Sequence, residues 1–158
     1  ALQFMQEQNI TEYDQLSAKA EDSVSRFHAL TEQLRRTEAD LSVTSELMGV
    51  VVRYAKTRPV FDGYKAAKYS RKYLAEHEAE LADYRAAKAM MGELLGGEKL
   101  PKMAELKEKR RQLAAQKKEL YTEYRSAQEE MRQAVAVKAN IDHLLGVTDS
   151  QRKKEQER

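Results

Sequence analysis

The sequence predicts an all-α protein, an elongated antiparallel coiled-coil-like hairpin of two long helices with a third, shorter helix packed near the hinge. Two long stretches, 11–48 and 102–145, contain neither Gly nor Pro. In both stretches apolar residues recur at alternating steps of three and four, which places them in one line along a helix. Charged residues make up 34% of the 158 residues, a composition that suits exposed helices with narrow apolar seams.

The first long helix is predicted over about 12–57. Thr11 is a suitable N-cap, because its hydroxyl can accept a hydrogen bond from an unpaired backbone N–H. Pro59 lacks the N–H that a helix needs and disfavours helical geometry at the preceding residue, so we expect the helix to stop there. The expected seam is Phe27, Leu30, Leu34, Thr37, Leu41, Thr44, Met48 and Val51.

A second, shorter helix is predicted over 71–95, after a short helical connection at 60–69. Ser70 can cap this helix, and Gly96-Gly97 should end it, because glycine readily adopts the left-handed conformation that closes a helix. Its expected apolar line is Leu74, His77, Leu81, Tyr84, Lys88, Met91 and Leu95.

The third helix is predicted over 102–145, with a charged, disordered tail at 148–158. We therefore expect a single helical domain over 1–147. The two long helices are of similar length, which favours an antiparallel hairpin, although a three-helix arrangement with the long helices parallel also fits the sequence. The expected seam is Leu113, Lys117, Leu120, Tyr124, Ala127, Met131, Ala134, Lys138, Ile141 and Leu145.

The composition excludes several classes of protein for this chain. The chain has no Cys, which excludes disulfides and zinc–thiolate sites and fits a cytoplasmic location. No segment has the roughly 20 consecutive apolar residues that span a bilayer, and residues 1–10 lack the pattern of a signal peptide. Because the chain opens on Ala1, we expect a piece of a longer protein.

Positive charge is concentrated in one window, 53–72, which holds seven Lys and Arg against the single acid Asp62. This window carries +6, so the rest of the chain carries −4. Such a patch indicates an anionic partner, and we predict DNA. The predicted DNA-binding residues are Arg53, Lys56, Arg58, Lys65, Lys68, Arg71 and Lys72.

Tyrosines are interleaved with these cations, and aromatic rings can stack on unpaired bases. The candidates for base stacking are Tyr54, Tyr64 and Tyr69. The competing interpretation, which we favour for the rings, is that they fill the core at the hinge between the helices.

No catalytic or metal-binding pattern is evident. The three histidines form neither an HExxH motif nor a Glu-x-x-His pair, and His77 lies among acids that point in different directions around a helix. Gly96-Gly97 lacks the Lys-Ser/Thr ending of a phosphate-binding loop. We therefore expect no catalytic residue, no metal, no cofactor and no small-molecule substrate.

Several short motifs resemble the C-terminal region of relaxase/mobilisation nucleases, carried by conjugative and mobilisable elements of Gram-positive gut bacteria. The motifs are Tyr54-Ala-Lys-Thr-Arg58, Tyr64-Lys65, Tyr69-Ser70-Arg-Lys72, Glu76-His77-Glu78, Leu100-Pro101-Lys102 and Lys138-Ala-Asn140 to Leu144-Leu145-Gly146. In this family an N-terminal domain with a histidine cluster nicks DNA and stays attached through a tyrosine. This chain has no such cluster, so the resemblance does not imply nicking.

The resemblance instead implies a non-catalytic accessory domain of a relaxase that assists DNA binding and relaxosome assembly in conjugative transfer. The alternative is a structural coiled-coil module for self-association, as a homodimer, or for docking to a relaxosome or other transfer-machinery protein, without DNA contact. Neither interpretation involves a membrane.

Overall fold

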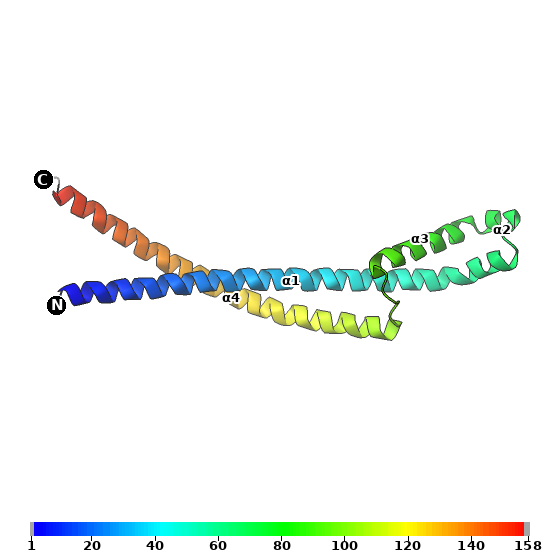
Figure 1. The fold of residues 1–158 in the computed structure, drawn as a ribbon, viewed down its shortest axis with the longest axis horizontal. Helices are drawn as coiled ribbons and strands as arrows, with labels where there is room; N and C mark the ends of the chain where they lie inside the picture. Colours follow the sequence, from blue (N-terminus) through cyan, green and yellow to red (C-terminus); the bar gives the residue numbers. More distant parts are fainter. Residues whose placement is uncertain (1, 157–158) are drawn as a thin grey trace. The chain divides into compact units, whose positions relative to one another are not determined.

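The computed structural model describes residues 2–156, leaving out the side chains at 5 and 147–156. It is all-helical, as predicted, and the part described contains no strand. The four helices are α1 (Leu2–Ala66), α2 (Arg71–Glu76), α3 (Glu78–Leu95) and α4 (Met103–Gln156) (Figure 1).

The chain divides into two compact units within the described helices. Unit 1 comprises Ala1–Arg35 and Lys118–Arg158, and unit 2 comprises Arg36–Lys117. Both long helices contribute to both units, so each unit contains a segment of α1 that packs against a segment of α4.

In unit 1 the two long helices pack together through side chains that are far apart in sequence. The rings of Phe27 and Tyr124 have centroids 5.1 Å apart, and Arg26 forms an ion pair with Glu130 at 2.8 Å. Further along, the Tyr13 hydroxyl donates to Asp142 Oδ1 at 2.6 Å. Residue numbers on α4 fall as those on α1 rise through these contacts.

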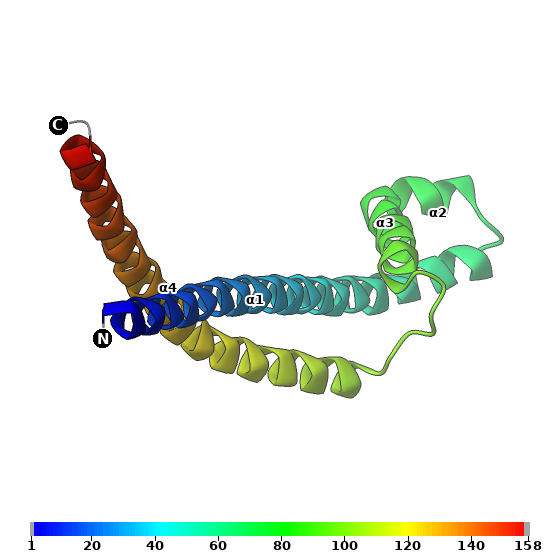
Figure 2. The same ribbon diagram turned by 60° about the vertical axis from the view of Figure 1, so that its left-hand side comes forward.

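Unit 2 has a small apolar core where α1, α3 and the start of α4 meet. Its buried centre is formed by Leu47, Met48 and Leu106. Partly buried residues from α3 and the loop that follows it pack around this centre: Met91, Leu94, Leu95 and Leu100. Figure 2 shows α3 folding back beside the C-terminal part of α1, and this places the later turns of α1 against a second helix.

Both predicted ends of the first helix are wrong. Helix α1 already begins at Leu2, and the Thr11 hydroxyl donates to the Glu7 carbonyl at 3.0 Å within the helix instead of capping it. At the other end α1 continues through Pro59 to Ala66. The proline removes the helical hydrogen bond to the carbonyl of Ala55. Contacts to other helices hold the segment beyond it. Phe61 stacks on Tyr84 of α3 with centroids 4.2 Å apart, and the Tyr73 hydroxyl donates to the Val60 carbonyl at 2.7 Å. Residues 60–66 are thus part of α1 and not a separate connection.

A tight left-handed turn ends α1. Lys68 N donates to Lys65 O at 2.9 Å and Tyr69 N to Tyr64 O at 3.0 Å, which is the paired hydrogen-bond pattern of a Schellman motif. Lys68 and Tyr69 both have positive φ, 54° and 58°. Glycine normally occupies such a position, since a side chain in this conformation costs about 1–2 kcal/mol.

The helices that follow agree with the prediction at two points and differ from it at two others. Ser70 caps α2 by accepting from Tyr73 N at 3.4 Å, as expected, but His77 leaves helical geometry and separates α2 from α3. Gly96 ends α3 with φ 57°, as predicted. Helix α4 continues past Gly146 to Gln156, whereas the sequence predicted that it ends at 145 and is followed by a disordered tail at 148–158. Residues 157–158 of that predicted tail lie outside the described residues.

Candidate nucleic-acid interface

Aromatic rings hold the end of α1 against α3. Tyr84 of α3 stacks on Tyr54 and on Phe61, with centroids 5.3 Å and 4.2 Å away, and is only 4% exposed. Burial raises the pKa of the Tyr84 hydroxyl above its ordinary value, and a hydrogen bond with Tyr54 raises it further. These rings therefore form part of the core of unit 2.

A second set of rings ties α1 to α2. Tyr64 is 8% exposed and stacks on Tyr73 at 6.0 Å, and Tyr73 in turn lies 4.3 Å from the His77 ring. The His77 Nδ1 atom is buried and has no hydrogen-bond partner among the described residues. The contact with Tyr73 lies next to the break between α2 and α3, so His77 contributes to packing at this corner.

The three candidates for base stacking thus lie in different environments. Tyr54 is half-buried against Tyr84, and Tyr64 is buried against Tyr73. Tyr69 is 59% exposed and touches Tyr64 only by an edge-to-face contact at 5.2 Å. Of the three, Tyr69 alone offers a largely exposed ring.

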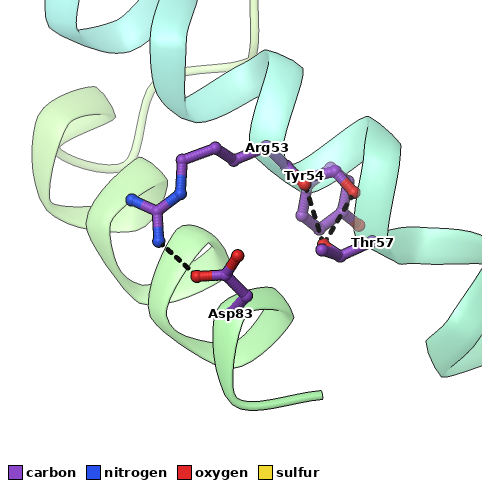
Figure 3. Close-up of polar contacts among 4 residues, drawn as sticks. All are labelled: Arg53, Tyr54, Thr57 and Asp83. Carbon is purple, nitrogen blue, oxygen red and sulfur yellow. Dashed lines mark hydrogen bonds and ion pairs between the residues drawn. The ribbon is translucent and has the colours of Figure 1, made fainter. Parts of the chain in front are cut away.

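The cations on α1 lie on two sides of the helix. Figure 3 shows Arg53 reaching from α1 to Asp83 on α3, an ion pair of 2.7 Å. In the same view the Thr57 hydroxyl donates to the Arg53 carbonyl at 2.8 Å. Arg58 is five residues beyond Arg53, so it points about 140° away around the helix. The buried side chain of Thr57 lies between these directions. The two arginines therefore flank the packed face on opposite sides, and Lys56 lies further round on the Arg53 side.

The remaining four cations are close together in sequence at the corner between α1 and α2. They are exposed, and no ion pair of the described residues involves them. No acid occurs between Asp62 and Glu76. The Nζ of one of them, Lys65, lies 5.1 Å from the centroid of the Phe61 ring. We call this group the basic turn: Lys65, Lys68, Arg71 and Lys72.

The charge of the whole chain is divided unevenly between the units. Unit 2 contains seventeen Lys and Arg against twelve Asp and Glu, which gives +5. Since the whole chain carries +2, unit 1 carries −3. The basic turn therefore lies on the unit that carries the excess of positive charge.

Neither a metal cluster nor a membrane-spanning segment is found in the part of the chain that the structure describes. Among the described residues, no three or more His, Cys, Asp or Glu side chains gather closely enough to bind a metal ion. None of the helices, over the residues described, contains a segment long and apolar enough to cross a membrane.

Comparison with protein-family models, with curated proteins and with solved structures found no match to this chain. The resemblance to relaxases therefore rests on the sequence motifs alone.

Proposed function

We propose that this chain is a non-catalytic accessory module of a relaxase that binds DNA through the basic turn. One observation carries the proposal: four exposed cations, with no ion pair among the described residues, lie within a few residues of the exposed Tyr69 where α1 turns into α2. Cations that are not neutralised within the protein can replace the counterions that DNA phosphates otherwise hold.

Backbone strain at the same corner supports the proposal. Lys68 and Tyr69 both adopt the left-handed conformation without being glycine. Strained residues of this kind persist only where the surrounding structure holds them, and they are often found at functional sites. Here the buried ring of Tyr64 and the two hydrogen bonds of the turn hold them.

The proposal narrows the set of contact residues. Arg53 is already paired with Asp83. Arg58 points to a different side of α1 from Arg53. We therefore assign the main phosphate contacts to the basic turn and secondary ones to Lys56 and Arg58. Tyr69 is the residue that remains available for stacking.

A binding titration with matched charge variants tests this function. In the test variant the four residues of the basic turn are each replaced by Glu. In the control variant four other exposed cations of unit 2 are replaced by Glu, so the net charge is the same: Lys99, Lys102, Lys107 and Arg110.

We expect the test variant to lose DNA binding and the control to retain most of it, because local contacts and not net charge carry the interaction. Equal loss in both variants, or no binding by the wild type at low salt, would remove the DNA role. Nicking of DNA by this chain with added Mg²⁺ would contradict the non-catalytic assignment.

The second candidate function is a coiled-coil module for self-association, in which α1 and α4 form an antiparallel hairpin. The residue numbers paired in unit 1 support such a hairpin. Apolar side chains exposed near the outer ends of both helices favour a partner: Leu2, Phe4, Ile10, Leu144 and Leu145. Light scattering tests it, with a dimer expected for the wild type and a monomer for the double variant Ile10→Gln, Leu145→Gln.

A further inference from the structure

A cavity of about 300 Å³ opens beside the small core of unit 2. Its apolar walls come from α1, from the end of α3 and from the first turns of α4: Val43, Leu47, Leu95 and Leu106. Leu47 and Leu106 are almost fully buried, whereas Val43 is 44% exposed and stands at the rim. The cavity is thus continuous with the core but open to solvent.

The cavity has four polar lining residues, of which two are acidic and one is basic. The fourth is Thr44. Its hydroxyl already donates to the Asp40 carbonyl at 2.8 Å, so it needs no hydrogen bond from a bound group. Glu98 and Glu105 lie at the edge, together with the single cation Lys109. None of these three forms an ion pair among the described residues. The charged residues that line the cavity therefore sum to −1, on a unit that carries +5 as a whole.

The backbone around the cavity is well defined by local interactions. Gly96 and Gly97 turn the chain with φ 57° and 90°, a conformation that glycine adopts without strain. Glu98 N donates to Leu95 O at 3.0 Å, which holds the start of the loop. Glu105 Oε2 accepts from Lys102 N at 3.3 Å, so its other oxygen remains available at the edge of the cavity.

From this arrangement we infer that the cavity is a docking site for a partner polypeptide that inserts one aliphatic side chain and places a Lys or Arg beside it. The volume is at the lower limit of the roughly 300–1,000 Å³ typical of small-molecule sites, which suits a single anchoring side chain. The two carboxylates select a cationic neighbour for that anchor, because opposite charges at a rim favour encounter and orientation. This inference does not depend on DNA binding.

The test uses a synthetic helical peptide that carries one Leu with a Lys four residues later. A control peptide has Glu in place of that Lys. Binding to the whole chain is followed by NMR of its methyl groups. We expect the Lys peptide to shift the methyl signals of the four apolar wall residues, and the Glu peptide to bind about tenfold more weakly.

Two variants of α1 give a matched comparison. Val43→Trp should fill the mouth of the cavity and weaken binding of the Lys peptide by about tenfold or more, because the peptide loses its buried anchor. Val52→Trp adds the same ring at a position of unit 2 that is 57% exposed and outside the cavity, and it should leave binding unchanged. Glu98→Lys should remove the preference between the two peptides.

Three results would overturn the inference. The first is equal weakening by the two Trp variants. The second is methyl shifts that lie mainly outside the cavity. The third is equal affinity for both peptides in the wild type, since the carboxylates would then play no part. Circular dichroism of each variant verifies that it is helical before binding is measured.

Discussion

The salt dependence of DNA binding distinguishes the basic turn from the full set of seven cations. For duplex DNA the logarithm of the binding constant falls with the logarithm of salt concentration by about 0.9 per phosphate neutralised. If the four cations of the basic turn make the contacts, we expect a slope of about −3.6. If all seven predicted residues make them, the slope should be about −6.3.

These slopes correspond to clearly different losses of affinity. Between about 50 mM and 200 mM salt, four contacts predict a fall of about 150-fold, and seven predict a fall of about 6,000-fold. Fluorescence anisotropy of a labelled duplex, at four or more salt concentrations within this range, measures the slope directly. The variant Arg53→Gln provides an internal check, because Arg53 is engaged by Asp83 and its loss should leave the slope unchanged.

With the secondary contacts of Lys56 and Arg58 included, six contacts give a slope of about −5.4. A slope steeper than this would refute the argument that the Arg53–Asp83 ion pair removes Arg53 from the contact set. A slope near zero would refute phosphate contact altogether. A slope that falls by about one when Arg53 is replaced would show that the ion pair opens in the complex, and the contact set would have to include Arg53.

The remaining predictions concern stability and are measured by chemical denaturation monitored by circular dichroism. Leu81→Ala should lower the free energy of unfolding by about 2–5 kcal/mol, because Leu81 is fully buried. The pKa of Tyr84 is raised in the folded chain, so this residue contributes stability below pH 10 that is lost as pH rises through the folded pKa; Tyr84→Phe should reduce that alkaline loss. Gly49→Ala should stabilise α1 by about 1 kcal/mol, since nothing lies near the added methyl group. Gly63→Ala should instead destabilise the protein by about 1–3 kcal/mol, because the methyl group would collide with the Tyr73 hydroxyl.

Sequence periodicity predicted much of the first seam, because burial in helix pairs follows the spacing of apolar residues directly. In the other two predicted lines Lys88 and Leu145 are exposed instead. Leu30, Leu34, Thr37 and Thr44 are all buried, although two of them are polar. Thr44 satisfies its hydroxyl within its own helix, at the Asp40 carbonyl, so a threonine can occupy the seam without an unpaired polar group. Gly96 likewise ended α3 where local conformation predicted it.

Local rules failed where contacts between helices outweigh them. Pro59 is a strong helix breaker in isolation. The residues after it stay helical because Phe61 stacks on Tyr84 and Tyr64 is buried. Aromatic pairs contribute about 0.5–1.5 kcal/mol beyond the area that they bury. Their combined effect is comparable with the cost of about 3 kcal/mol for an interior proline. The sequence contains these rings, but not the position of α3 that brings Tyr84 to them.

The candidate site was predictable in composition but not in geometry. A charge count over 53–72 treats seven cations as one patch, whereas a helix distributes them around its axis and a neighbouring helix can neutralise one, as Asp83 does for Arg53. The four cations that remain together do so because α1 ends among them. A helix end reverses the chain within a few residues, so side chains that a longer helix would send to different sides project from one corner.

The buried tyrosines and the basic turn are therefore parts of one arrangement. Burial of Tyr64 fixes the last turn of α1, and the hydrogen bond from Tyr69 N to Tyr64 O fixes the left-handed turn that follows. A glycine at position 68 would form this turn with less strain, yet the chain has a lysine there. The aromatic core thus holds a cation and an exposed ring in a conformation that they would not adopt alone.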